Sequence, residues 1–361
     1  MNLVVVQDYL RSGGTERQSV LLADAFAEHG HTSTLLTFRP GGTLKPTLNH
    51  ARHVALQRFD TRLDWWAPGL LRTLVSLHPD AVLCMGRMAN SRGASIKAAL
   101  TRACVIATMR TGKALPWLYR RSLLAADHVI ANSRDAVDTL VDAYGVDRAK
   151  CSAIANSLVF RETRDAASQR ARLREKCEAE ASTVVLLCVA MFRPEKNQRE
   201  LIEIASELPR TMDWQLWFAG DGPELASCEK VVDELGLGRR VRFLGWMKDP
   251  TPAYAAADVA VHASRSEALS NFLIEAQAHG LPVVAYQAQG NRECVVPGNT
   301  GHIVAPGNAD AFRSAILEFA SADPAARAGR AAQARRFARE SFDPDKQIRA
   351  YLALIERLSI R

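Results

Sequence analysis

Short apolar runs alternate with amphipathic stretches along almost the whole chain. Six such runs lie in the first 160 residues, at 2–7, 33–38, 81–85, 104–109, 128–133 and 151–156. Longer stretches between them, such as 16–30 and 134–145, repeat apolar residues at helical spacing and end at Gly. Apolar strands that alternate with helices are typical of a parallel sheet covered on both faces. The pattern therefore predicts an α/β domain over 1–160.

The same alternation restarts after a charged, strand-poor stretch, 161–182, in which we expect a helix. Six further apolar runs follow, at 183–192, 213–220, 240–245, 257–264, 281–286 and 301–306. Three helical patterns then run from 308 to the end. We therefore expect two Rossmann-like, doubly wound domains that face a cleft, 1–160 and 161–342, with a C-terminal helix at about 343–361 packing back on the first. Such sheets bind ligands beyond the carboxyl ends of their strands.

Composition limits the class of protein. The chain has 361 residues, 48% hydrophobic and 24% charged, as in soluble globular proteins. No run approaches the roughly 20 apolar residues of a membrane-spanning helix, and the opening "MNLVVVQDYLRSGG" predicts a strand rather than a signal peptide. Seven cysteines without a CxxC pair predict reduced thiols in the cytoplasm, with no zinc or redox site.

The net charge of +7 is concentrated in the first domain. Residues 1–160 hold 19 Lys and Arg against 12 Asp and Glu. This surplus fits an anionic partner, or it is simply a basic surface. Two segments, 58–66 and 115–129, interleave aromatic residues with arginines. They predict either peripheral contact with an anionic membrane or an ordinary half-buried helix. We expect no nucleic-acid partner.

The first strand leads into a glycine-containing loop, "QDYLRSGGTERQ" (7–18). Gly13 and Gly14 lie at a turn into a helix that we expect to begin near Thr15 or Glu16. Glycines let the backbone approach a ligand closely, and the free N–H groups of a helix start favour an anion. The GxGxxG dinucleotide fingerprint is not present. The alternative is a purely structural Gly-Gly turn.

A second loop, "VAMFRPEKNQ" (189–198), places two cations after a strand. Arg193 and Lys196 precede a helix that we expect to open at Asn197. Two cations at the end of a strand suit a diphosphate. The alternative is solvated surface charge.

A third loop lies in "SRSEALSNFLIEAQAHGLPVVA" (264–285), after another predicted strand. Ser270 or Asn271 can cap a helix that runs to about residue 279, where Gly280 and Pro282 end it. The loop thus contains one glutamate, and the helix contains a second just over one turn inside.

These glutamates are Glu267 and Glu275. Each carboxylate can accept two hydrogen bonds, which suits the paired hydroxyls of a ribose or a hexose. The N–H groups of Leu269, Ser270 and Asn271 lie at the helix start, where they can meet an anion or a hydroxyl. The alternative is one loop glutamate and one solvent-facing helix glutamate.

Taken together in this order, the loops resemble those of family 4 of the retaining glycosyltransferases, which have the GT-B fold. The resemblance is diffuse over 1–182 and strong over 183–306, and Glu267 and Glu275 match the family's E-x7-E motif. The segments that carry it are "GGTERQ" (13–18), "FRPEKN" (192–197), "FAGDGPE" (218–224), "VRFLGW" (241–246), "SEALSNFLIEAQAHGLPVVA" (266–285) and "GNRECVVPGNTGHIV" (290–304).

The resemblance implies a nucleotide-sugar donor held mainly by the second domain. Glu275 would bind the ribose hydroxyls, and Glu267 would contact hydroxyls of the donor sugar. The backbone N–H groups of Leu269, Ser270 and Asn271 would support that contact.

The resemblance also implies which residues hold the rest of the donor. Lys196 would neutralise the diphosphate, helped by Gly14 of the first domain, with Gly13 and Arg193 as further donor-binding residues. The base would lie against backbone groups near Leu244. No metal or cofactor is expected, because this fold stabilises the departing diphosphate with cations and helix dipoles.

Three positions depart from the family pattern. Met191 stands where the family often has Arg, a role that Arg193 would take from a shifted position. Ala268 replaces the Gly that usually follows the first motif glutamate. Many members have a His in a strand-end loop of the first domain, but 107–117 contains none, and Arg110 is the candidate there for the diphosphate or acceptor side.

The implied function is a metal-independent retaining glycosyltransferase, with Glu267, Lys196 and Arg110 as candidate catalytic residues. A nucleotide-diphosphate sugar, commonly a UDP-sugar, would be the donor, and a glycan or lipid-linked acceptor of lipopolysaccharide, capsule or exopolysaccharide synthesis would receive the sugar. Two alternatives stay open: another GT-B enzyme such as a nucleotide-sugar epimerase, and a non-catalytic nucleotide-sugar-binding subunit. We expect a cytoplasmic protein with peripheral contact to the inner face of the membrane.

Overall fold

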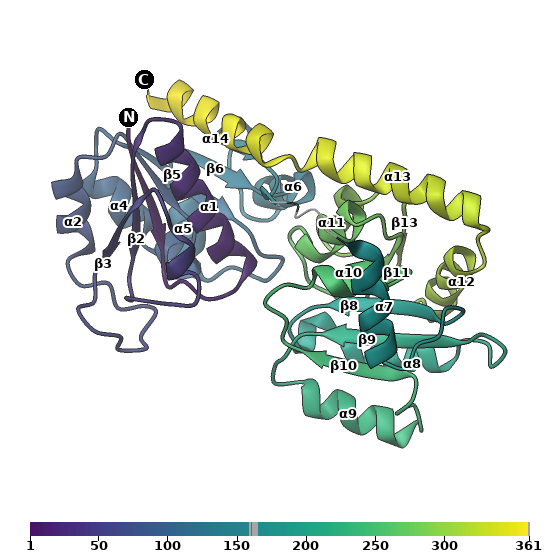
Figure 1. Cartoon of the computed structure of the whole chain (residues 1–361). Coiled ribbons are helices and arrows are strands. Elements are labelled where there is room, and N and C mark those ends of the chain that lie inside the picture. The colour runs from purple at the N-terminus through teal and green to yellow at the C-terminus, as the bar shows by residue number, and fades with distance from the viewer. Residues whose placement is uncertain (159, 161–164, 360–361) are drawn as a thin grey trace. The chain divides into compact units, whose positions relative to one another are not determined.

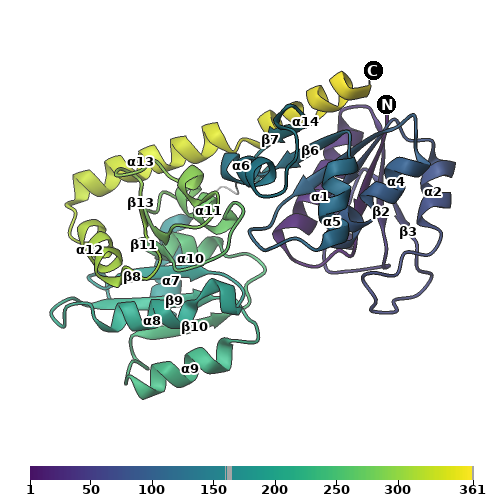
Figure 2. The ribbon, with the colours of Figure 1, turned by 180° about the vertical axis from the view of Figure 1, so that it is seen from behind.

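The computed structural model describes residues 1–158, 160 and 165–359 (Figures 1 and 2). The chain divides into two compact units, Met1–Ser157 with Pro344–Arg361, and Leu158–Asp343. The start of the helical stretch expected at 161–182, residues 161–164, and the last two residues of the expected C-terminal helix lie outside the described residues.

The first unit is built on a seven-stranded sheet in which every neighbouring pair of strands is parallel. Its order is β3-β2-β1-β4-β5-β6-β7. The strands are β1 (Asn2–Gln7), β2 (Thr32–Thr37), β3 (Arg52–Ala55), β4 (Ala81–Cys84), β5 (Cys104–Met109), β6 (His128–Ala131) and β7 (Cys151–Ala153). The sequence pattern missed β3, because this edge strand is only half-buried and its "RHVA" lacks an apolar run.

Helices cover both faces of this sheet. Along β1, Leu3 and Val5 pack with residues of α1 and α14, whereas Val4 and Val6 pack with residues of α2 and α4. The C-terminal helix α14, yellow in Figure 1, packs against α1 and β5. The helices of this unit are α1 (Gly14–Glu28), η1 (Lys45–Thr47), α2 (Leu70–Leu77), α3 (Arg87–Ser91), α4 (Gly93–Ala99), α5 (Trp117–Ala125), α6 (Arg134–Asp142), η2 (Arg148–Lys150) and α14 (Pro344–Ser359).

The second unit contains a six-stranded parallel sheet, ordered β10-β9-β8-β11-β12-β13. Its strands are β8 (Val184–Val189), β9 (Trp214–Ala219), β10 (Val241–Gly245), β11 (Val259–His262), β12 (Val283–Tyr286) and β13 (Gly301–Val304). Its helices are α7 (Ala166–Lys176), η3 (Pro194–Lys196), α8 (Gln198–Ser206), α9 (Leu225–Glu234), α10 (Thr251–Ala256), α11 (Asn271–Ala278), η4 (Asn291–Cys294), α12 (Ala309–Ala320) and α13 (Pro324–Ser341).

Both sheets are wound in the same order. In each, the first strand lies inside the sheet, the next two extend to one side, and the chain then returns to the other side. The order therefore reverses between β1 and β4 in the first sheet and between β8 and β11 in the second. Such a reversal is where open α/β sheets bind ligands, beyond the carboxyl ends of the strands. The predicted fold class of two Rossmann-like doubly wound domains is confirmed.

The ends of α11 were anticipated in part. Gly280 adopts a left-handed conformation after the helix, and the N–H groups of Gly280 and Leu281 donate to the carbonyls of Gln277 and Ala276. This is a Schellman ending, as the Gly-x-Pro sequence predicts. Ser270 occupies the N-cap position, as one of the two expected residues, but its side chain makes no capping hydrogen bond.

Among the described residues, we find no helix with the length and apolar character needed to cross a bilayer.

Candidate functional site

The candidate site lies where the strand order of the second sheet reverses. β8 is followed by η3, which ends at Lys196, and β11 is followed by a loop that contains Glu267. Because β8 and β11 are neighbouring parallel strands, these two loops leave the same edge of the sheet side by side. Lys196 and Glu267, 71 residues apart in the chain, meet there, and Lys196 Nζ donates to Glu267 Oε1.

The two loops are also joined by hydrogen bonds to backbone carbonyls. Glu195 O accepts hydrogen bonds from Arg265 N, at 2.9 Å, and from Ser264 Oγ, at 3.1 Å. Asn197 Nδ2 donates to Ala263 O at 3.3 Å. These bonds hold the loop after β8 against the loop after β11. They therefore restrict how far Lys196 and Glu267 can move apart.

His262 is a third member of this cluster, and the sequence reasoning missed it. The side chain is 1% exposed, at the end of β11, and its Nε2 lies 2.8 Å from Glu267 Oε1. Burial lowers the pKa of His262 although Glu267 opposes the shift, so the ring is neutral and donates its Nε2–H. The only signal in the sequence was a polar residue inside the apolar run of a strand.

Glu267 is held as an anion in a buried place. The residue is 9% exposed, and burial alone would raise the pKa of its carboxyl group. The positive charge of Lys196 and the hydrogen bond from His262 outweigh this effect and lower the pKa to about 2. Lys196 and His262 both donate to Oε1, so their two bonds leave Oε2 for another donor.

Glu275 has its own partner. It lies half-buried on α11, where the hydroxyl of Tyr254 donates to its Oε2 at 2.7 Å. Tyr254 is buried on α10, and its ring stacks on His279 with centroids 4.8 Å apart. Glu275 is therefore held in position by a hydrogen bond rather than freely solvated. After His262, Tyr254 is the second residue of the site that the sequence did not indicate.

The remaining predicted residues of the second unit surround this edge of the sheet. Arg193 is exposed at the start of η3, and Leu269 and Ser270 are buried just before α11, whose first residue is Asn271. Leu244 lies at a bulge in β10. Phe243 pairs with Phe218 of β9 and Gly245 pairs with the next residue, Ala219, so the pairing skips Leu244. Such bulges free backbone groups from the ladder and are frequent beside active sites.

In the first unit, the glycine turn after β1 differs slightly from the expectation. α1 begins at Gly14, with Gly13 as N-cap, so the helix starts one to two residues earlier than Thr15 or Glu16. A Cβ added at Gly13 would lie 2.4 Å from Glu16 Oε2, because this side chain folds back over the turn. Only this flexible carboxylate would have to move to admit a larger residue, and the extended backbone of Gly13, with φ at -72°, does not itself require glycine.

Arg110 follows β5 and is engaged within the first unit. Its guanidinium donates to Asn156 Oδ1, shortly after β7, and to the hydroxyl of Tyr351 on α14. These bonds tie α14 to the end of the sheet, a structural task that the sequence did not suggest. The role of Arg110 toward a ligand stays a prediction.

Asp8 marks the strand-order reversal of the first sheet. It follows β1, and its carboxylate accepts hydrogen bonds from the N–H groups of Met88, at 2.9 Å, and Ala89, at 2.7 Å, in the helix after β4. Burial raises the pKa of Asp8 to about 6 despite these two bonds. The sequence reasoning did not single it out, although an acid directly after an apolar strand is a recognisable signal.

Throughout the described part of the chain, no three His, Cys, Asp or Glu side chains are grouped as a metal ion would require.

Comparisons with known proteins match each unit to a glycosyltransferase domain. Residues 12–158 match the model "Glycosyltransferase Family 4", and residues 169–337 match "Glycosyl transferases group 1". The solved structure of Anabaena HepE in complex with UDP and glucose is similar with a TM-score of 0.82, over 99% of this chain and 100% of that one, at 21% identity.

Two relatives from Rhizobium meliloti (strain 1021) are similar in sequence. The lipopolysaccharide core biosynthesis glycosyltransferase LpsE is 36% identical over 143 residues, 40% of this chain and 41% of LpsE. The lipopolysaccharide core biosynthesis glycosyltransferase LpsD is 31% identical over 51% of this chain and 52% of LpsD. The alignments thus span about half the length of these relatives or less. The fold is therefore that of GT-B proteins, and each of the two units matches the model of a glycosyltransferase domain.

Proposed function

We propose that the protein is a retaining glycosyltransferase that moves a sugar from a nucleotide-diphosphate sugar, with UDP as the nucleotide, to a glycan or lipid-linked acceptor. The observation that carries the proposal is the convergence of Glu267, Lys196 and His262 at the strand-order reversal of the second sheet. Similarity to lipopolysaccharide core biosynthesis glycosyltransferases and to a structure with bound UDP and glucose supports the acceptor class and the donor class.

The donor sugar and diphosphate are assigned to the cluster around Glu267. Its Oε2 would accept hydrogen bonds from sugar hydroxyls while Oε1 keeps its bonds to Lys196 and His262. A lysine ammonium has three N–H donors, so Lys196 can bind the diphosphate without leaving Glu267. Arg193 would add a second cation. The backbone N–H groups of Leu269, Ser270 and Asn271, at the positive end of α11, would support the donor sugar.

The nucleoside end is assigned to two further features. Glu275, oriented by Tyr254, would accept hydrogen bonds from both ribose hydroxyls. Backbone groups near Leu244 would bind the base, since the bulge in β10 releases them from the strand ladder.

The acceptor side is assigned to the first unit. Arg110 is the candidate contact there, for the diphosphate or the acceptor, whereas Gly13 and Gly14 of the same unit are assigned to the donor. Residues 1–160 also carry the whole positive surplus of the chain, which would favour a phosphorylated or otherwise anionic acceptor.

The chemistry that these residues supply is placement and charge stabilisation. As the bond between sugar and diphosphate breaks, negative charge grows on the leaving diphosphate, and Lys196 and Arg193 would stabilise it. Because these cations would balance that charge, we expect turnover without an added divalent metal and unchanged turnover in EDTA.

The test is a panel of nucleotide sugars. A ligand present at 100 times its dissociation constant stabilises a protein by about 2.7 kcal/mol, so a thermal-shift screen identifies the donor. Slow release of free nucleotide from that donor then marks a transferase. Tight binding with no release would identify a nucleotide-sugar-binding subunit instead, and conversion of the sugar while it stays attached would identify an epimerase.

A second proposal concerns location: we infer peripheral contact with an anionic membrane at the cytoplasmic face. Phe59, Trp65 and Trp117 are 69%, 55% and 68% exposed, in the loop before α2 and on α5. α5 also carries Arg120 and Arg121, and α2 and α5 both pack against α4, so these helices lie on one face of the sheet. Aromatic rings with neighbouring arginines suit an anionic lipid surface.

Co-sedimentation with phosphatidylglycerol vesicles tests this location. We expect binding at low salt that weakens as salt increases, and weaker binding of Trp117→Ala. Trp246→Ala is the matched control, since Trp246 is 57% exposed on the second unit. Absence of co-sedimentation at low salt would remove the proposal.

A further inference from the structure

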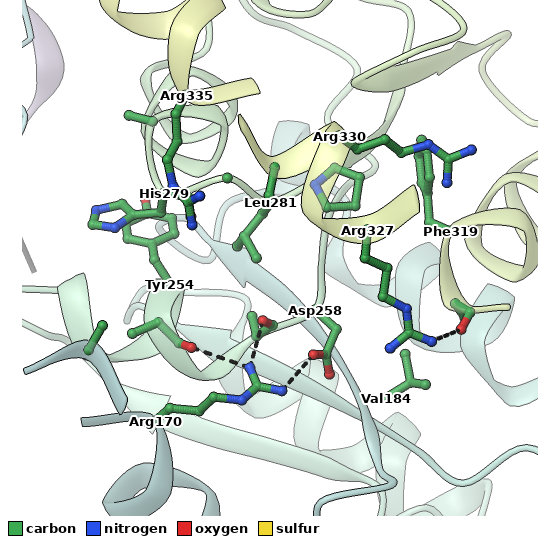
Figure 3. A pocket seen from close by; sticks show the side chains of 18 of the residues that line it. Arg170, Val184, Tyr254, Asp258, His279, Leu281, Phe319, Arg327, Arg330 and Arg335 are labelled. Carbon is green, nitrogen blue, oxygen red and sulfur yellow. Dashed lines mark hydrogen bonds and ion pairs between the residues drawn. The ribbon is translucent and has the colours of Figure 1, made fainter. Parts of the chain in front are cut away.

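The second unit has a recess at the opposite edge of its sheet from the candidate site (Figure 3). The recess has a volume of about 560 Å³. Its lining includes Val184 at the start of β8, Asp258 just before β11, and Leu281 and Pro282 just before β12. Since all strands of this sheet are parallel, these residues mark its amino edge, whereas Lys196 and Glu267 lie at its carboxyl edge. The recess is therefore separate from the candidate site around Glu267.

Positive charge dominates this recess. Its lining residues include five arginines and a single carboxylate, Asp258. Figure 3 shows that Arg170 comes from α7 on one side, while Arg327, Arg330 and Arg335 come from α13 on the other. The fifth arginine is Arg339, also on α13.

Part of this charge has a structural task. The helices α10, α11 and α12 all end at this edge, and their last carbonyls carry partial negative charge. Arg170 donates to carbonyls at the end of α10 and to Asp258, at 2.7 Å, and Arg327 donates to carbonyls at the end of α12. Arg335 donates to the carbonyl of the residue that follows α11, at 3.2 Å. The arginines thus neutralise helix ends, but carbonyl contacts do not cancel their full charges.

The remaining charge is unpaired. A guanidinium has five N–H donors, and Arg335 uses one of them in a long bond. Across the described ranges of the chain, no carboxylate forms an ion pair with Arg327, Arg335 or Arg339. Arg330 is the exception, because it pairs with Glu318 at 3.3 Å, its guanidinium lies over the ring of Phe319, and its Nη1 is buried. Spare donors on several guanidinium groups form a site for an anion.

The walls of the recess suit an organic ligand. Val184, Leu281 and Phe319 present apolar surface, and the stacked rings of Tyr254 and His279 form another wall. Ligand sites combine such surfaces with a few charged groups that fix orientation. We propose that this recess binds a small organic phosphate, such as a sugar phosphate, with its phosphate on the arginines of α13 and α7.

Calorimetric titration of the full chain with glucose 6-phosphate and with glucose tests the proposal. We expect glucose 6-phosphate to bind and glucose not to bind, because the phosphate supplies the contacts. Arg335→Gln should weaken binding at least about tenfold, the effect of losing one charge-assisted contact. Arg336→Gln, an exposed neighbour on α13 that does not line the recess, should leave binding within about twofold.

Further variants separate this site from the donor site. Lys196→Ala should keep binding of glucose 6-phosphate, because Lys196 lies at the other edge of the sheet. If Arg335→Gln does not fold, Arg339→Gln replaces it, since Arg339 is exposed. Tyr254 is left unchanged because it also holds Glu275. No binding to the wild-type chain, equal binding by the arginine variants, or loss of binding in Lys196→Ala would each overturn the proposal.

Discussion

The two sheets reverse their strand order in the same way, yet the acids at the two reversals have opposite properties. Glu267 in the second unit meets Lys196 and a neutral histidine, which lower the pKa of its carboxyl group to about 2. Asp8 in the first unit meets two backbone N–H groups, and burial raises its pKa to about 6. The shared strand order thus places a carboxylate at the reversal of both sheets. The neighbouring side chains decide whether it is a fixed anion or a group that titrates near neutral pH.

The largest effect is expected from removing the cation of the second reversal. Lys196→Ala should lower turnover roughly 100-fold, because a charge-assisted donor to the leaving group contributes about 3 kcal/mol to the barrier. Single-turnover rates with a saturating nucleotide sugar measure this effect. Arg199→Ala, an exposed arginine on the adjacent helix α8, is the control that should leave the rate unchanged. Equal rates for Lys196→Ala and the wild-type chain would contradict the proposed role.

The two acids should respond to pH with opposite sign. The folded pKa of Glu267 lies below its ordinary value of 4.5, so its stabilising contribution is complete above pH 4.5 and is lost as pH falls toward about 2. The folded pKa of Asp8 lies above its ordinary 3.8, so its contribution is complete below pH 3.8 and is lost as pH rises through about 6. Each shift corresponds to about 3 kcal/mol of unfolding free energy over its full window.

Urea unfolding from pH 3 to pH 8 measures this difference. Glu267→Gln should flatten the acid side of the stability profile, and Asp8→Asn should flatten the loss between about pH 4 and pH 6. Identical profiles for the wild-type chain and both variants would show that the two carboxylates do not differ as described.

Removing the histidine should have an intermediate effect. His262→Leu takes one hydrogen bond from a buried carboxylate, and hydrogen bonds to charged groups contribute about 1.5–3 kcal/mol to stability. We expect the free energy of unfolding to fall by about 2 kcal/mol and donor affinity to weaken. His262→Gln keeps an N–H donor and should recover part of the donor affinity. If both variants bind the donor equally well, the His262–Glu267 bond does not orient the carboxylate.

The smallest effect is expected at the second carboxylate of the motif. Tyr254→Phe removes the neutral hydroxyl donor of Glu275, and such bonds contribute about 1 kcal/mol. The donor KM should rise about fivefold with little change in kcat, since the ribose contact is the same in the ground and transition states. Tyr144→Phe in the first unit is the matched control. A fall in kcat with unchanged KM would exclude a binding role for Glu275.

The sequence pattern anticipated most of the strands, because continuous apolar runs are required wherever a parallel strand is buried on both faces. It missed β3, which lies at an edge and is only half-buried. The Schellman ending of α11 was readable from Gly280 and Pro282, since left-handed backbone favours glycine. The absent cap bond of Ser270 was not readable, because the orientation of a buried side chain depends on its neighbours.

The candidate site was only half visible in the sequence. Lys196 and Glu267 follow from residue types in strand-end loops, Glu275 follows from its place in the next helix, and the resemblance to a known family indicates all three. His262 and Tyr254 did not stand out, since one lies inside an apolar strand and the other in a short helix.

The sequence by itself determined the alternation of strands and helices, the position of charged loops after strands, and the surplus of positive charge in the first 160 residues. These are local properties that each segment carries wherever it lies. Only the tertiary structure decided that β8 lies beside β11, and therefore that Lys196 contacts Glu267 across 71 residues. The tertiary structure also decided which arginines of α13 line the recess, because the packing of a helix determines which of its side chains face a given cavity.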